Sequence, residues 1–121
     1  SKKILIVDDN KLNIKVAEIL LKKYNFQIES VLSGKECIDK INSGNNYDLI
    51  FMDYMMPEMD GIETLNNLKQ IPNFKTKVIA LTADAIEGSK EKFLNAGFDE
   101  YISKPIDKSI LNDVILKFIQ K

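Results

Sequence analysis

Residues 48–53 read DLIFMD, and this stretch predicts a strand in the middle of a sheet. Leu49, Ile50, Phe51 and Met52 are apolar without interruption, as expected for a strand that is covered on both of its faces. Half-exposed strands alternate apolar and polar residues instead. The stretch therefore indicates an α/β protein with helices on both sides of a parallel sheet.

Short apolar runs alternate with segments of helical period along the rest of the chain. The other expected strands span residues 4–7, 26–31, 78–81 and 101–103. The expected helices run from about 11 to 24, from a Ser33 cap to about 42, from an Asp60 cap to about 70, from about 86 to 96, and from 106 to 119. Regular alternation of this kind is typical of βα units around a parallel sheet. We therefore expect a doubly wound α/β fold with five parallel strands and five helices.

Polar residues at the expected helix starts support these boundaries. Asn10 is expected to cap the first helix. Ser33 with Glu36, and Asp60 with Glu63, have the spacing of a capping box. The face of the first helix that we expect to pack in the core contains Asn13, Val16, Ala17, Leu20 and Tyr24.

The composition limits the classes of protein to consider. The chain has 121 residues, of which 45% are hydrophobic and 29% charged, and this fits one folded domain over residues 1–121. A net charge of −1 argues against direct nucleic-acid binding through bulk charge. No apolar run approaches the ~20 residues of a membrane span, and no cleavable signal precedes the first strand. The single Cys37 cannot form an internal disulfide, which fits a reducing cytoplasm.

Histidine and arginine are both absent, since all 17 basic residues are lysines. The chain therefore contains no histidine general base, histidine metal ligand, phosphohistidine or arginine finger. Its chemistry must rely on carboxylates, lysine, threonine, serine, tyrosine or Cys37. Ser1 stands where a Met is expected, which fits removal of an initiator Met or a domain of a longer protein.

The expected strands end in polar residues of complementary chemistry. Asp8 and Asp9 follow the first strand, Asp53 ends the third, Thr82 follows the fourth and Lys104 follows the fifth. Ligands of open parallel sheets bind outside these carboxyl ends. Three converging carboxylates repel one another, and a hard divalent cation relieves the repulsion. Oxygen ligands suit Mg²⁺ or Mn²⁺, whereas zinc is disfavoured without histidine or a cysteine cluster.

This set of groups predicts acceptance of a phosphoryl group. A carboxylate nucleophile, a metal, a cation and a hydroxyl donor can position a phosphoryl group and neutralise its oxygens. Asp53 would form an acyl phosphate, and Lys104 and Thr82 would stabilise the other phosphoryl oxygens. The five glycines, at positions 34, 44, 61, 88 and 97, form no phosphate-binding loop, so ATP chemistry is not expected.

Four motifs in chain order resemble the response-regulator receiver domain of two-component signalling. They are ILIVDDN at residues 4–10, MDYMMP at 52–57 with DG at 60–61, ALTA at 80–83, and YISKP at 101–105. The resemblance spans essentially the whole chain. It implies a flavodoxin-like receiver fold with strand order 2-1-3-4-5, in a phosphoprotein of signal transduction.

The resemblance also implies roles for the motif residues. Asp53 is implied as the phosphoacceptor, with Thr82 and Lys104 bound to the phosphoryl group. Pro105 is implied to follow a cis peptide bond that orients Lys104. The implied metal ligands are Asp8, Asp9, Asp53 and the backbone carbonyl of Met55.

Phosphorylation of Asp53 is expected to shift the protein between two conformations. Thr82 would move toward the phosphoryl group, and Tyr101, the implied switch aromatic, would occupy the vacated space. Met55 and Asp84 hold positions that, by resemblance, flank the water that removes the phosphoryl group. Because a methionine side chain cannot hold this water, we expect a long-lived phosphoryl group unless transfer to a partner removes it.

The stretches DDNKLN at 8–13 and ALTADA at 80–85 are similar to those of receivers at the C-termini of hybrid sensor histidine kinases. This implies a histidine kinase or a histidine phosphotransfer domain as partner. It also implies a cytoplasmic location, which includes the cytoplasmic part of a membrane-bound sensor kinase. Such a receiver catalyses only its own phosphorylation and dephosphorylation and has no independent kinase activity. A stand-alone single-domain response regulator is the second hypothesis.

The first helix carries a further apolar stripe beside its expected core face. The stripe consists of Leu12, Val16 and Ile19, at spacing i, i+4, i+7. Stripes of this kind usually pack in the core. If Leu12 and Ile19 are exposed, we interpret them as docking contacts for a helix of the partner.

Three rival interpretations fit the residues less well. A haloacid-dehalogenase-like phosphatase needs an acid two residues after a nucleophile on the first strand, but Asn10 follows Asp8 and Lys11 follows Asp9 at that distance. An FMN module of the same fold needs a Ser/Thr-rich phosphate loop, where this chain has acids that repel phosphate. An interaction module without phosphorylation would not need the complete set of phosphoryl-binding residues that includes Asp53.

Overall fold

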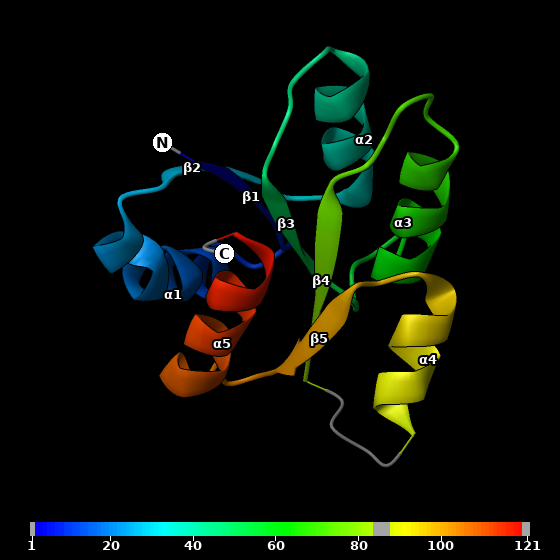
Figure 1. Ribbon diagram of the computed structural model, residues 1–121. Coiled ribbons are helices and arrows are strands. Elements are labelled where there is room, and N and C mark those ends of the chain that lie inside the picture. Colours follow the sequence, from blue (N-terminus) through cyan, green and yellow to red (C-terminus); the bar gives the residue numbers. More distant parts are fainter. Residues whose placement is uncertain (1, 84–87, 120–121) are drawn as a thin grey trace.

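Strands and helices alternate along the chain in the computed structural model, which describes residues 2–83 and 88–119 (Figure 1). The strands are β1 (Lys3–Val7), β2 (Gln27–Val31), β3 (Leu49–Asp53), β4 (Lys77–Thr82) and β5 (Glu100–Ser103). The α-helices are α1 (Lys11–Leu21), α2 (Gly34–Asn42), α3 (Gly61–Lys69), α4 (Ser89–Ala96) and α5 (Lys108–Phe118), and a short 3-10 helix, Lys22–Tyr24, continues α1. Across these described ranges, no helix combines the length and the apolar character needed to cross a membrane.

The strands form one parallel sheet in the order β2-β1-β3-β4-β5. Every residue of β3 is buried, whereas only Val31 of the edge strand β2 is buried. The expected strand order and the edge position of the second strand are therefore confirmed. The strand order reverses between β1 and β3, and ligands of such sheets bind in the crevice at this reversal. The carboxyl ends of β1 and β3 are thus the place to look for a site.

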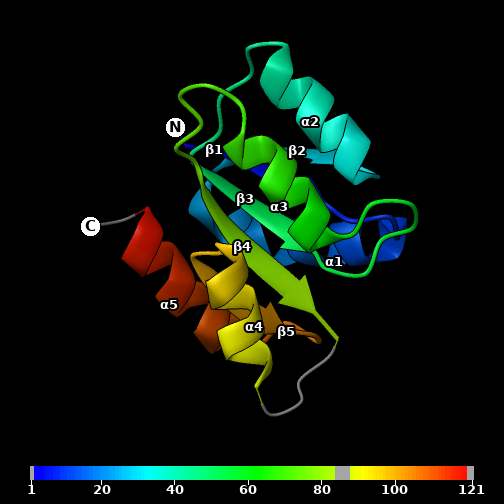
Figure 2. The same cartoon turned by 90° about the vertical axis from the view of Figure 1, so that its right-hand side faces the viewer.

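Helices cover both faces of the sheet. α1 and α5 pack on one face, where Ile6 and Phe51 belong to the core. α2, α3 and α4 pack on the other face, where Leu5 and Ile50 belong to the core, and Figure 2 turns these three helices toward the viewer. Successive residues of a strand point to opposite faces, so the uninterrupted apolar runs supply both cores. Each fully buried Leu, Ile or Phe contributes about 1.5–3 kcal/mol of transfer free energy.

Side-chain caps start three helices where the sequence predicts them. Asn10 Oδ1 accepts a hydrogen bond from the backbone N–H of Leu12 at 2.8 Å. Ser33 Oγ accepts one from the N–H of Glu36 at 3.1 Å. Asp60 and Glu63 form a complete capping box at the start of α3. The loops that carry the strand-end residues are therefore anchored at their helical ends.

Several boundaries differ from the prediction by one to three residues. β2 begins at 27 rather than 26, β3 at 49 rather than 48, β4 spans 77–82 rather than 78–81, and β5 begins at 100 rather than 101. α1 ends at Leu21 and passes into the 3-10 helix. α5 starts at Lys108 rather than 106 and ends at 118 rather than 119, because the Asp107 side chain accepts the N–H of Ser109 at 2.8 Å and caps the helix there. The predicted start of the fourth helix at 86 lies outside the described residues.

The predicted core face of α1 is only partly correct, because Ala17 is buried as expected but Val16 is not. The buried residues of α1 are Ile14, Ala17 and Leu21, whereas Val16 is 44% exposed. The structure favours this rotation because Ile14, Ala17 and Leu21 form a fully apolar stripe, which a stripe containing the carboxamide of Asn13 does not.

Candidate functional site

Three carboxylates meet at the carboxyl ends of β1 and β3. Asp8 and Asp9 follow β1, and Asp53 is the last residue of β3. One carboxylate oxygen of each residue lies within 4.8 Å of the others. Asp8 and Asp53 are buried, whereas Asp9 is exposed. The cluster is therefore accessible to solvent on the Asp9 side, and its set of hard oxygen ligands fits Mg²⁺.

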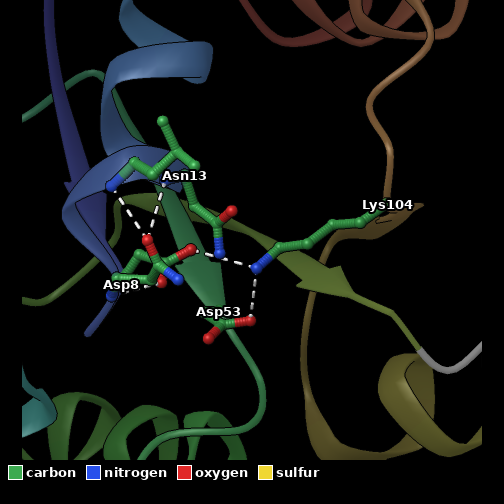
Figure 3. Close-up of polar contacts among 6 residues, drawn as sticks. Asp8, Asn13, Asp53 and Lys104 are labelled. Carbon is green, nitrogen blue, oxygen red and sulfur yellow. Dashed lines mark hydrogen bonds and ion pairs between the residues drawn. The ribbon is translucent and has the colours of Figure 1, made fainter.

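Lys104 extends from the end of β5 into this cluster (Figure 3). Its Nζ donates hydrogen bonds to Asp8 Oδ2 at 3.0 Å and to Asp53 Oδ1 at 2.9 Å. The backbone N–H of Lys104 donates to the carbonyl of Thr82 at 2.7 Å, which fixes the position of the lysine relative to β4. The Lys104–Pro105 peptide bond is cis, the conformation that the resemblance implies.

The charges of the cluster do not balance, because three carboxylates face one ammonium group. Burial raises the pKa of Asp53 above its ordinary value; the hydrogen bond from Lys104 opposes this rise, and the charges of Asp8 and Asp9 add to it. Burial alone would lower the pKa of Lys104, but its hydrogen bonds to Asp53 and Asp8 outweigh that effect and the pKa is raised. The excess negative charge favours a bound cation.

Thr82 lies on β4, the neighbour of β3, and Tyr101 lies on β5, the next strand along the sheet. Thr82 ends β4 and is fully buried. Tyr101 pairs with Ala80 in the β4–β5 register and is half-buried. The ring of Tyr101 stacks on Phe93 of α4, with 6.0 Å between the ring centroids. A movement of Thr82 at the end of β4 therefore takes place beside β5, the strand that carries Tyr101.

Asn13 is a residue that sequence analysis assigned to the core and the structure places at the site. With Asp8 and Lys104 it lines a cleft of about 270 Å³ between α1 and the turn after β5. Its carboxamide points into this cleft in Figure 3. The available signal was its position in the first turn of α1, three residues after the Asn10 cap, which brings it back toward the end of β1.

The remaining predicted site residues are those expected to act in docking and dephosphorylation. Leu12 is 69% exposed and Ile19 63%, so the condition for the docking interpretation is met. Met55 lies in the loop between β3 and α3 with an exposed side chain. Asp84 lies outside the described residues.

The arrangement presents a nucleophile beside a positive charge. Asp53 Oδ1 is held by Lys104, and within the described part of the chain no hydrogen bond engages Oδ2. A carboxylate in this position can attack an electrophile, and Lys104 can neutralise the negative charge that develops on the group under attack. The oxygen-rich surroundings and the excess negative charge suit a phosphoryl group only together with a divalent cation.

Comparison with known proteins gives one consistent result. The family model for the response regulator receiver domain matches residues 4–116. Hybrid signal transduction histidine kinase M of Dictyostelium discoideum is 40% identical over 96% of this chain. The receiver domain of a sensor histidine kinase from Pseudomonas aeruginosa PAO1, solved with a magnesium ion coordinated in its active site cleft, superposes with a TM-score of 0.87 at 30% identity, and covers 100% of this chain and 99% of that one.

A further solved structure contains a protein complex. It is the co-crystal structure of a Saccharomyces cerevisiae histidine phosphotransfer protein with the receiver domain of its downstream response regulator. The similarity has a TM-score of 0.83 at 26% identity and covers 98% of this chain and 88% of that one. Among the first curated relatives, this chain spans only 5% to 14% of the full length.

Proposed function

Because this chain belongs to the response-regulator receiver family of two-component signalling, we propose that Asp53 accepts a phosphoryl group from a phosphohistidine of a partner protein. One observation carries the proposal: the Asp53 carboxylate ends the central strand, 2.9 Å from the Lys104 ammonium and beside two further carboxylates. The partner must supply the histidine, since this chain has none.

The chemical step is an in-line transfer between the two proteins. An oxygen of Asp53 attacks the phosphorus atom and forms the O–P bond of an acyl phosphate, while the P–N bond to the histidine breaks. The electron pair of the broken bond leaves with the imidazole, which then takes up a proton. Lys104 stabilises the charge on the transferred group, and the Thr82 hydroxyl donates to another phosphoryl oxygen.

Asp8, Asp9 and Asp53 would hold Mg²⁺, with the backbone carbonyl of Met55 as a further ligand. The fit rests on the three carboxylate oxygens within 4.8 Å of one another and on their hard donor chemistry. When bound, Mg²⁺ supplies positive charge to the phosphoryl oxygens. Mn²⁺ prefers the same ligands and is expected to substitute.

The signal is read through a shift in conformation. Thr82 moves toward the phosphoryl group, and Tyr101 moves into the space that Thr82 leaves. The pairing of β4 with β5 supports this coupling, because it puts Thr82 two positions along from the residue opposite Tyr101. The surface formed by α4 and β5 then differs between the two states.

The partner is proposed to be a histidine kinase or a histidine phosphotransfer protein, and this chain to be the receiver of a hybrid kinase in the cytoplasm. The 40% identity to a hybrid histidine kinase supports this assignment. The exposed stripe of Leu12, Val16 and Ile19 is the proposed docking contact, beside the cleft that opens on Lys104. With 17 basic against 18 acidic residues, the chain is not expected to bind nucleic acid directly.

Intact-mass measurement tests the proposed function. Purified protein is incubated with acetyl phosphate and Mg²⁺, and the wild type is compared with Asp53→Asn. We expect the wild type to gain one phosphoryl group only when metal is present, and the variant to gain none.

Thr76→Val is a matched control, because Thr76 is a hydroxyl-bearing residue that bonds to the carbonyl of Tyr47 and takes no part in the site. This control should gain the phosphoryl group as the wild type does. Equal gain by Asp53→Asn, or no gain by the wild type at any donor concentration, would contradict the proposal.

A further inference from the structure

Tyr54, the residue that follows Asp53, is tied to the end of β4 and to α3 by its backbone. Its N–H donates to the carbonyl of Leu81 at 2.9 Å, one residue before Thr82. Its carbonyl accepts from the N–H of Gly61 at 2.8 Å. A displacement of the Asp53 backbone therefore moves Tyr54 as well.

The side chain of Tyr54 packs against α4. Its ring meets the ring of Phe93 edge-on, with 5.0 Å between centroids and 75° between planes. Lys92 of α4 holds the same ring from another direction: its Nζ donates to Tyr54 Oη at 2.9 Å and lies 4.3 Å from the ring centroid. Both contacts connect the loop after Asp53 to α4, although the loop itself leads into α3.

Phe93 continues the contact to the switch residue. It is 1% exposed, and its other aromatic neighbours are Tyr101 on β5, at 6.0 Å and 27°, and Phe98, at 5.9 Å and 83°. Aromatic pairs at these separations contribute beyond the area they bury. The three rings of Tyr54, Phe93 and Tyr101 thus form one packed series from the residue beside Asp53 to the switch tyrosine.

We propose that Tyr54 and Phe93 are positioning residues that hold Tyr101 in its present place until Asp53 is phosphorylated. This inference rests on the proposed function of Asp53. The stack stabilises the unphosphorylated arrangement, because Tyr101 must leave the face of Phe93 to enter the space beside Thr82. Loading of Asp53 shifts the adjoining Tyr54 and weakens the support of Phe93, so the aromatic series acts alongside the movement of Thr82.

The inference predicts a linked pair of effects. If the stack is removed, the population of the switched state rises without phosphorylation, and the affinity for a phosphoryl mimic rises by the same factor. Loss of one aromatic pair corresponds to a change of about 2- to 10-fold in the switching equilibrium constant. The concentration of beryllofluoride that half-loads the protein in Mg²⁺ should therefore fall by about 2- to 10-fold.

The probe is beryllofluoride with Mg²⁺, and the readout is fluorine NMR of protein labelled with fluorotyrosine. The chain has four tyrosines, and Tyr101→Phe assigns the signal of the switch residue. The test variants are Phe93→Leu, which removes the middle ring, and Tyr54→Leu, which removes a half-buried ring and perturbs folding less. Tyr54→Phe keeps the ring and loses only the hydroxyl that binds Lys92, so its shift should be smaller.

Phe98→Leu is the matched control. It is the same substitution at a buried neighbour of Phe93, but Phe98 is not between Tyr54 and Tyr101. We expect it to lower stability against urea without changing the half-loading concentration. Comparison with Phe93→Leu separates the specific contact from general loosening of the core.

The outcomes separate this inference from the proposed function. Lower half-loading concentrations in Phe93→Leu and Tyr54→Leu, with Phe98→Leu unchanged, support the inference. The inference is overturned if the wild type binds beryllofluoride and its Tyr101 signal shifts, but the variants need the same concentration of beryllofluoride or more. That result leaves the proposed function intact. Wild-type protein that does not load at all overturns both.

Discussion

Gly61 lies against the backbone of the phosphoacceptor, and Gly61→Ala should damage the site without touching any of its side chains. A Cβ atom at position 61 would lie 2.7 Å from the carbonyl oxygen of Asp53 and 3.0 Å from Cα of Tyr54. Both are backbone atoms, so neither can rotate away as a flexible side chain could. The hydrogen bond of 2.8 Å from the N–H of Gly61 to the carbonyl of Tyr54 also holds the two segments together.

The cost of Gly61→Ala can be worked out from how closely the new Cβ atom would approach the backbone of Asp53. An ordinary contact needs about 3.4 Å, so the backbone of Asp53 or the start of α3 must move by about 0.7 Å. Overpacking of this kind costs about 1–3 kcal/mol, against which alanine regains up to about 1 kcal/mol as a better helix former. Because a misplacement of about 1 Å in a reacting group can cost about 100-fold in rate, we expect about 10-fold slower phosphorylation.

Two measurements check this reasoning, with Gly44→Ala as the control. Gly44 has a φ of +95°, and a Cβ atom at this position would have no neighbouring atom within 4 Å, so alanine there costs about 1–2 kcal/mol of backbone strain far from the site. Urea unfolding should show comparable losses for both variants, whereas phosphorylation by acetyl phosphate should slow only in Gly61→Ala. Wild-type rate and stability in Gly61→Ala, or equal slowing in both variants, would refute the argument.

Three further predictions concern the docking stripe, the phosphoryl lifetime and the edge strand. A double variant with Ser in place of both Leu12 and Ile19 should slow phosphotransfer from a phosphorylated partner by about 10-fold, and phosphorylation by acetyl phosphate should keep its rate. Equal slowing with both donors would contradict a docking role. Met55→Asn should shorten the phosphoryl lifetime, because an amide can hold the attacking water, and an unchanged decay measured by intact mass would count against it. The hydrogen bond from Tyr47, and after it that from Lys3, lowers the pKa of Glu29. The stability that Glu29 adds is therefore present above its unfolded pKa and is lost as the pH falls through its folded pKa. Glu29→Gln should lower the free energy of unfolding by about 1 kcal/mol or less at pH 7, and a loss that persists in urea unfolding at pH 3 would refute this prediction.

The central strand shows how far the sequence predicts the fold. The apolar run from Leu49 to Met52 predicts a strand with cores on both faces, and the structure confirms it. The alternation of strands with capped helices then leaves few arrangements, because parallel strands need crossover helices. Element boundaries were less predictable, since caps such as Asp107 compete with neighbouring residues of similar propensity.

The candidate site likewise has a part that the sequence predicts and a part that it does not. The site residues lie at the carboxyl ends of parallel strands or directly after them, so their placement at one edge of the sheet could be predicted from topology alone. They are Asp8, Asp9, Asp53, Thr82 and Lys104. The rotation of α1 could not, because two apolar stripes competed for the core and the choice depended on how each fits the sheet.

Local patterns in the chain set the order of the elements and the chemistry at the strand ends, because both follow from short stretches of residues and from the parallel direction of the strands. The pairing of side chains across elements, in contrast, depends on the assembled fold. The paired hydrogen bonds of Lys104 to Asp8 and Asp53, the turn of Asn13 into the cleft, and the stacking of Phe93 between Tyr54 and Tyr101 join residues far apart in the chain. Such contacts depend on ångström-scale packing of several elements at once, which no local pattern encodes.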